Sequence, residues 1–101
     1  MKVVLSMSEA SKWALVNTNV KNLFIEDPTL EIAVVAFSEG VTVFEDPNIQ
    51  LYSHATYYLC NNAIEVRGVD RSKLPKTVKI VNSGIYQILL LQEEGFKYVR
   101  P

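Results

Sequence analysis

The stretch Leu30–Phe37, LEIAVVAF, decides the fold of this chain. It is apolar almost throughout and does not alternate between apolar and polar residues. Strands of this kind are buried on both faces and are typical of the centre of a parallel sheet. The shorter run Lys2–Ser6, KVVLS, has the same character. We therefore expect a mainly parallel sheet whose central strands are covered on both sides.

Strands and helices alternate along the rest of the chain, with Ser8 as the expected N-cap of the first helix. Its apolar residues recur at spacings of three and four, and Asp27-Pro28 ends it. The alternation predicts a three-layer α/β/α sandwich with five strands, formed as a single domain by residues 1–101. The expected strands are Lys2–Ser6, Leu30–Phe37, Thr56–Cys60, Thr77–Val81 and Phe96–Val99, and the later helices are Asn61–Arg67 and Gly84–Glu94. Gly68 is expected to end the first of these helices, Asp70 to cap a turn through Leu74, and Ser83 to cap the last helix.

The middle of the chain is ambiguous. Ser38-Glu39-Gly40 breaks the second strand, and Val41–Phe44 fits either a strand or the start of a weak helix. Ile49–His54 is at best a short helix.

The last helix is apolar nearly all round. One face carries Ile85, Ile88, Leu89 and Gln92, and Tyr86 and Leu90 lie on another. A helix of this kind is usually buried on two sides, so we expect a second subunit to cover it. The alternative is that Tyr86 and Leu90 are singly exposed apolar residues, which are common.

Composition excludes several classes of protein. Ten Lys and Arg residues against eleven Asp and Glu give a net charge of −1, without the basic stripe of a nucleic-acid-binding protein. One cysteine cannot form an intramolecular disulfide, and no apolar run is long enough for a signal peptide or a membrane span. We therefore expect a cytoplasmic protein that binds neither nucleic acid nor membrane.

The common phosphate-loop, dinucleotide-binding and zinc motifs are absent, and the chain has one Cys and one His. We expect neither a metal nor an organic cofactor.

Cys60 is the strongest candidate for chemistry. It ends an expected strand and precedes an expected helix, and the carboxyl ends of parallel strands face the functional crevice of such sheets. Unpaired backbone N–H groups and the helix dipole at that point would favour the thiolate. The competing interpretation is a buried, inert cysteine. His54 is no partner within one chain, because a strand of roughly 16 Å separates the two residues; we expect it to be exposed or at the end of a helix.

The segment Cys60–Leu74, CNNAIEVRGVDRSKL, resembles the DsrE/DsrF-like family, which includes sulfur-relay proteins of the Tus type and YchN-like proteins. The resemblance extends over nearly the whole chain. Its other elements are MKVVLSMSEASKWALVNTNVKNL from residue 1, VVAFSEGV from residue 34 and SGIYQILLLQEEGFKYVRP from residue 83.

This resemblance implies a five-stranded sheet of order 43215 and assembly into homotrimers or homohexamers. For the sulfur-relay members it also implies a cysteine that carries a persulfide, and Cys60 alone matches that residue. The section Thr42–His54 departs from the family, because it is short and weakly helical compared with the family's second helix.

The leading hypothesis is a sulfur carrier, with a donor and an acceptor protein as partners. Cys60 would hold the persulfide, and Asn61 and Asn62, with their backbone amides, would steady the anion. Arg67 would raise the local potential if its helix turns back over the site.

Two alternatives remain open at this point. One is a small-ligand-binding protein with an incidental thiol, whose crevice is lined by Ser6, Gly40 and Cys60. The other is a purely structural oligomeric module, in which Cys60 is buried and unreactive.

Overall fold

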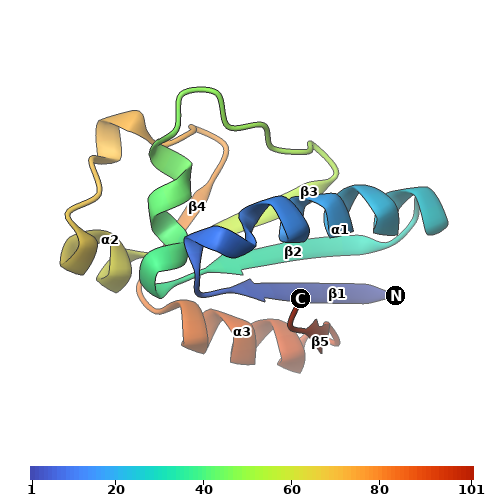
Figure 1. The fold of residues 1–101 in the computed structure, drawn as a ribbon. Helices are drawn as coiled ribbons and strands as arrows, with labels where there is room; N and C mark the ends of the chain where they lie inside the picture. Colours follow the sequence, from blue (N-terminus) through green and yellow to red (C-terminus); the bar gives the residue numbers. More distant parts are fainter.

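The sheet has five parallel strands in the order β4-β3-β2-β1-β5 (Figure 1). This is the expected order, and the strand formed by LEIAVVAF lies at its centre, between β1 and β3. The computed structural model describes every residue from Met1 to Pro101. The strands are β1 (Lys2–Met7), β2 (Glu31–Ala36), β3 (Ala55–Cys60), β4 (Lys79–Val81) and β5 (Lys97–Val99).

Helices cover both faces of the sheet, which gives the predicted three layers (Figure 1). Most of the helical elements lie on one face, and a single helix, α3, covers the other. No helix is both long and apolar enough to cross a membrane. The α-helices are α1 (Trp13–Glu26), α2 (Asn61–Arg67) and α3 (Gly84–Glu93), and the 3₁₀ helices are η1 (Ala10–Lys12), η2 (Ser38–Glu45) and η3 (Arg71–Lys73).

The two faces bury very different amounts of apolar side chain. The larger core contains residues of α1, η2 and α2, and Phe44 of η2 is fully buried within it. The smaller core lies under α3, where Ile88 and Leu91 are the buried residues of the helix. Ile85 and Leu89 remain half exposed, because one helix alone cannot cover this face of a five-stranded sheet.

The Tyr57 ring packs in the larger core, and its hydroxyl forms hydrogen bonds at the edge of that core. Its ring lies 6.0 Å from that of Trp13 and 6.3 Å from that of Phe44. Its hydroxyl donates to Asn17 Oδ1 at 2.7 Å and accepts the N–H of Tyr52 at 3.2 Å. Tyr57 is therefore both a core residue and the partner that holds the loop before β3 onto α1.

Most helix ends fall where the sequence predicts them. α1 ends just before Asp27, and Gly68 takes the left-handed conformation (φ 64°) that ends α2. The Asp70 carboxylate accepts the N–H of Ser72 at the start of η3, and the Ser83 hydroxyl accepts the N–H of Tyr86 at the start of α3.

The predicted start of the first helix is wrong. Ser8 caps nothing, because the chain first makes the 3₁₀ turn η1, and α1 begins only at Trp13. The N–H of Ala10 donates instead to Glu39 Oε1, from η2, at 2.9 Å. A partner 29 residues away cannot be inferred from local sequence.

The structure also shows what the ambiguous section between the second and third strands forms. Val41–Phe44 belongs to η2, and Ile49–His54 forms no helix, since it is held by turns and by the bond from Tyr52 to Tyr57. The fourth strand is shorter than expected, because a turn from Pro75 to Val78 precedes it.

Gly84 brings the first turn of α3 against the ends of β2 and β3. A Cβ atom at this position would lie 2.9 Å from Phe37 Cβ and 3.2 Å from Cys60 Cβ. Both distances are shorter than ordinary van der Waals contact, so only glycine allows α3 to start this close to the sheet.

Tyr57→Phe should lower the free energy of unfolding by about 1–3 kcal/mol at neutral pH, because it leaves two polar partners unpaired. Burial raises the pKa of Tyr57 above the usual tyrosine value of about 10. The folded protein therefore binds this proton more tightly than the unfolded chain does. The stabilisation by the Tyr57 hydroxyl is complete below about pH 10 and is lost as the pH rises above it. The difference in unfolding free energy between wild type and Tyr57→Phe should therefore narrow above about pH 10.

Denaturant unfolding at several pH values tests this. Tyr86→Phe is the control, because Tyr86 is 61% exposed. A gap that does not depend on pH would contradict the assignment.

Gly84→Ala should cost about 1–3 kcal/mol in unfolding free energy, because the added methyl forces α3 away from Phe37 and Cys60. Glu93→Ala, at an exposed position in the same helix, should change stability by less than about 0.5 kcal/mol. Equal unfolding midpoints for the two variants would show that the contact at Gly84 is not tight.

Candidate functional site

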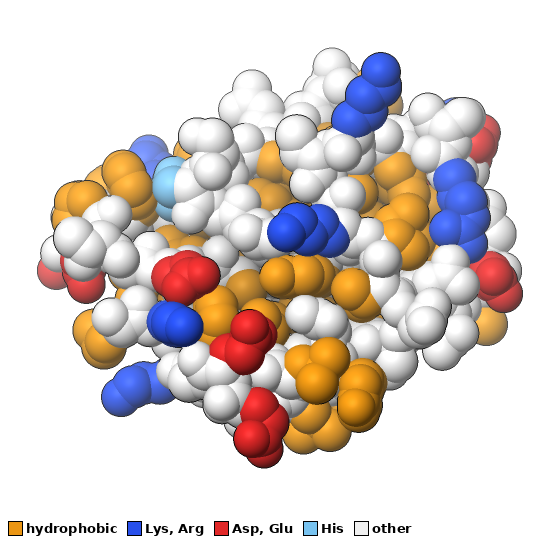
Figure 2. All heavy atoms as spheres, turned by 180° about the vertical axis from the view of Figure 1, so that it is seen from behind, with side chains coloured by type: hydrophobic (Ala, Val, Ile, Leu, Met, Phe, Trp, Pro, Cys, Tyr) orange, Lys and Arg blue, Asp and Glu red, His pale blue; other side chains and the backbone are white.

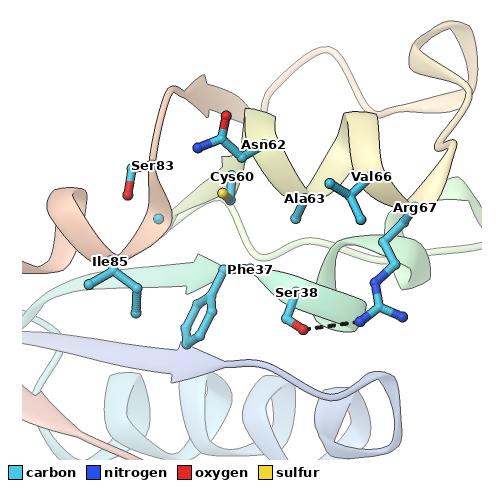
Figure 3. Close-up of a pocket in the computed structure, with 10 residues that line it drawn as sticks. Phe37, Ser38, Cys60, Asn62, Ala63, Val66, Arg67, Ser83 and Ile85 are labelled. Carbon is cyan, nitrogen blue, oxygen red and sulfur yellow. Dashed lines mark hydrogen bonds between the residues drawn. The ribbon is translucent and has the colours of Figure 1, made fainter.

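A pocket of about 260 Å³ lies at the carboxyl edge of the sheet, between α2 and the start of α3 (Figure 3). Its walls come from three places in the sequence that follow the ends of β2, β3 and β4, because parallel strands end at the same edge. The lining residues are Phe37, Ser38, Cys60, Asn62, Ala63, Val66, Arg67, Ser83, Gly84 and Ile85.

Cys60 is the last residue of β3 and the N-cap of α2, as expected. Its side chain borders the pocket and is 7% exposed (Figure 3). The thiol lies 3.9 Å from the carbonyl oxygen of Asn82, which is a weak hydrogen-bond contact. A reagent must therefore enter the pocket to reach the sulfur.

The first turn of α3 supplies free donors beside this thiol. The amides of the first turn of a helix have no partner inside the helix. Here the Ser83 hydroxyl takes the N–H of Tyr86 and the Ser83 carbonyl takes that of Gln87. The N–H groups of Gly84 and Ile85 remain without such partners, and both residues line the pocket. The positive end of the α3 dipole adds to their attraction for an anion.

Arg67 is the only charged residue that lines the pocket. Its guanidinium donates a hydrogen bond to Ser38 Oγ at 3.2 Å, which draws the last turn of α2 toward the end of β2 (Figure 3). Ser38 has φ 52°, in the left-handed region that residues other than glycine rarely adopt. The pocket therefore combines one cation with amide donors and no carboxylate.

Among the expected binding residues, Asn62 and Arg67 line the pocket with Cys60, but Asn61 does not. The Asn61 side chain donates to Glu65 Oε1 at 3.2 Å and accepts a hydrogen bond from Arg71. Residues four apart share a helix face, so Asn61 points with Glu65 away from the pocket. The expected part of the Asn61 side chain in steadying the anion is therefore wrong, whereas the role expected of the backbone amides stays a prediction.

Ser6 and Gly40 do not line the Cys60 pocket either, contrary to expectation. The Ser6 hydroxyl is buried against Tyr98 Oη at 2.8 Å. Gly40 packs against the end of β1, where a Cβ atom would collide with the carbonyl oxygen of Met7. Both residues therefore serve packing at neighbouring strands.

His54 stays at the opposite end of β3 from Cys60, as predicted, but it is neither exposed nor at a helix end. Its ring stacks on those of Phe24 at 4.0 Å and Tyr52 at 5.3 Å, and Nε2 is buried without a hydrogen-bond partner. Nowhere in the chain do three His, Cys, Asp or Glu side chains converge as metal ligands.

Sequence reasoning missed the other walls of the pocket. Phe37 and Ser38 follow the end of β2, and Ser83 and Gly84 follow β4, so the rule that parallel strands end at one edge could have found all four. Ser83 was recognised as a helix cap alone. The close contact of Gly84 with Cys60 depends on the packing of α3 and has no local signal.

The chain is similar to a solved structure along almost its whole length. It is the protein of unknown function MTH1491 from Methanobacterium thermoautotrophicum, with a TM-score of 0.81 and 31% sequence identity over 99% of this chain and 98% of that one. Neither a protein-family model nor a curated protein matches the chain. The identity and the coverage show that this chain belongs to the same family as MTH1491.

Proposed function

We propose that this protein is a sulfur carrier that holds a persulfide on Cys60, and that its family is of the DsrE/DsrF-like type. The observation that carries the proposal is a lone thiol in a pocket whose only charge is the cation of Arg67. Strand order 43215 and the position of Cys60 at the end of β3 are consistent with the proposed family.

The transfer needs no oxidant or reductant. The Cys60 thiolate attacks the outer sulfur of a donor persulfide, and a new S–S bond forms. The donor's own S–S bond breaks, and its electron pair leaves with the donor sulfur as a thiolate. An acceptor thiolate later attacks the outer sulfur of the Cys60 persulfide in the same way and restores the Cys60 thiolate.

The pocket supports each stage of this sequence. A persulfide on Cys60 is an anion, and the N–H groups of Gly84 and Ile85 with the Arg67 guanidinium are the donors and charge that attract it. The pocket volume of about 260 Å³ has room for the additional sulfur. Asn62 contributes an amide group at the rim, whereas the Asn61 side chain is bound elsewhere.

Incubation with a small-molecule persulfide donor should add one sulfur to the wild-type protein, detected as intact mass. Cys60→Ser should gain none. Arg67→Gln should load about three- to tenfold more slowly, because it removes the only charge that lines the pocket. Arg71→Gln is the matched control, since Arg71 pairs with Asn61 and Glu65 outside the pocket.

If wild-type Cys60 gains no sulfur under conditions that load a known persulfide carrier, the proposed function is wrong. If Arg67→Gln and Arg71→Gln load at the same rate, the cation at the pocket has no role.

A second candidate is a ligand-binding protein with an incidental thiol. The 7% exposure of Cys60 favours it, because a buried sulfur is slow to react. Cys60→Ser separates the two candidates. A carrier loses its function in this variant, whereas a binding protein keeps its ligand-induced stabilisation.

We also propose that the protein assembles with itself, as a homotrimer or homohexamer, through the outer surface of α3. Four large apolar side chains of this helix are 41–61% exposed. Figure 2 shows a cluster of apolar side chains at the lower right of the rear face, on the side of α3, with acidic and basic side chains to its left. Contiguous exposed apolar surface often marks an interface. This surface centres on Tyr86 and Leu90 of α3. Ile85 and Leu89 of α3 and Tyr98 of β5, which also line the pocket beside the helix, lie at its edge.

Sedimentation equilibrium should give three or six times the chain mass. Tyr86→Glu should reduce it toward one chain mass, because a charge in an apolar interface is costly. Ile25→Glu, at a 65%-exposed position of α1, should leave the assembly intact. A wild-type protein that sediments as a monomer would contradict the proposal.

A further inference from the structure

The Cys60 pocket has an apolar extension. A second pocket, of about 200 Å³, lies between α3 and the sheet and shares Phe37 and Ile85 with the first. It continues along the helix past Leu89 toward Tyr98. The two pockets are therefore neighbours with the side chains of Phe37 and Ile85 in common, and we call the pair the α3 groove. Together they fall within the range of about 300–1,000 Å³ that is typical of small-molecule sites.

The two ends of the α3 groove differ in chemistry. Arg67 and Ile85 lie at opposite sides of the Cys60 pocket, with the thiol between them (Figure 3). Beyond Ile85 the lining becomes almost entirely apolar, and its polar groups are Gln92 and the Tyr98 hydroxyl, which is already bonded to Ser6. Arg67 is the only charged residue that lines either pocket.

We propose that the α3 groove binds a small organic anion with an apolar body. The anionic group lies between Arg67 and the first-turn amides of α3, beside Cys60. The apolar body passes Phe37 and Ile85 and rests on Leu89. This inference deepens the proposed function and rests on it only for the role of the ligand, which would be the sulfur donor or the sulfur acceptor.

Charge and apolarity together select this class of ligand. An inorganic anion would leave the apolar arm at Leu89 in contact with water. An uncharged apolar molecule would leave the charge of Arg67 and the amides of Gly84 and Ile85 without an anionic partner. A cation would meet Arg67 with no carboxylate in the lining to balance it. An amphipathic anion satisfies both halves of the groove.

Calorimetry with hexanesulfonate, ethanesulfonate and hexanol tests the proposal, since none of these probes reacts with a thiol. Each buried methylene is worth about fourfold in affinity, so hexanesulfonate should bind at least about tenfold more tightly than ethanesulfonate. Hexanol, which lacks the charge, should bind more weakly than hexanesulfonate. Equal affinity for the two sulfonates, or for hexanesulfonate and hexanol, would overturn the proposal.

Two pairs of variants locate the binding. Leu89→Asn should reduce the preference for hexanesulfonate to less than about threefold, whereas Leu90→Asn should preserve it, because Leu90 lies outside the groove. Leu89 and Leu90 both belong to the proposed self-association surface, so both substitutions can affect assembly. A difference in sulfonate binding between them therefore reports on the groove. Arg67→Gln should weaken both sulfonates by a similar factor, and Arg71→Gln should weaken neither. If Leu89→Asn and Leu90→Asn behave alike, the apolar arm is not the binding site.

The outcomes also distinguish this inference from the proposed function. Sulfonate binding does not need the thiol, so Cys60→Ser should bind hexanesulfonate as wild type does. Binding without persulfide loading would support the groove and contradict the carrier. Persulfide loading without a preference for hexanesulfonate would support the carrier and contradict the groove. If no probe binds and Leu89→Asn lowers the assembled mass, the groove is occupied by a second copy of the chain, and the inference is wrong.

Discussion

The contact between Gly84 and the ends of β2 and β3 fixes how closely α3 approaches Cys60 at the candidate site. A Cβ atom at Gly84 would lie 2.9 Å from Phe37 Cβ and 3.2 Å from Cys60 Cβ, so the first turn of α3 can lie against the sheet only without a side chain. This closeness brings the free amides of α3 to the thiol.

The unequal cover of the two faces explains where apolar surface remains. One face is packed by α1, η2 and α2 around Phe44, and the other by α3 alone. A single helix buries Ile88 and Leu91 but leaves its flanks exposed. The same deficit of cover therefore produces both the apolar arm of the α3 groove and the surface proposed for self-association. Both features follow from the fold and need no special motif.

The sequence predicted the strands well, because buried parallel strands such as LEIAVVAF carry their signal locally. Caps within a few residues were also predictable, as Ser83 and Gly68 show. The predictions that failed concern contacts between residues far apart in the sequence. The cap expected from Ser8 is replaced by a hydrogen bond from Ala10 to Glu39, and His54 stacks on two aromatic rings instead of being exposed. Cys60 was predictable because it lies between an expected strand and an expected helix, whereas the direction of the Asn61 side chain depends on Glu65 and Arg71.

The central claim is that Cys60 lies in a pocket that attracts anions. The most direct measurement is the rate at which Cys60 reacts with two methanethiosulfonate reagents of similar size, one anionic and one cationic, each normalised to its rate with a small free thiol. The account predicts that the anionic reagent is favoured, that salt weakens the preference and that Arg67→Gln reduces it. A normalised rate that is equal for the two reagents, or higher for the cation, would contradict it.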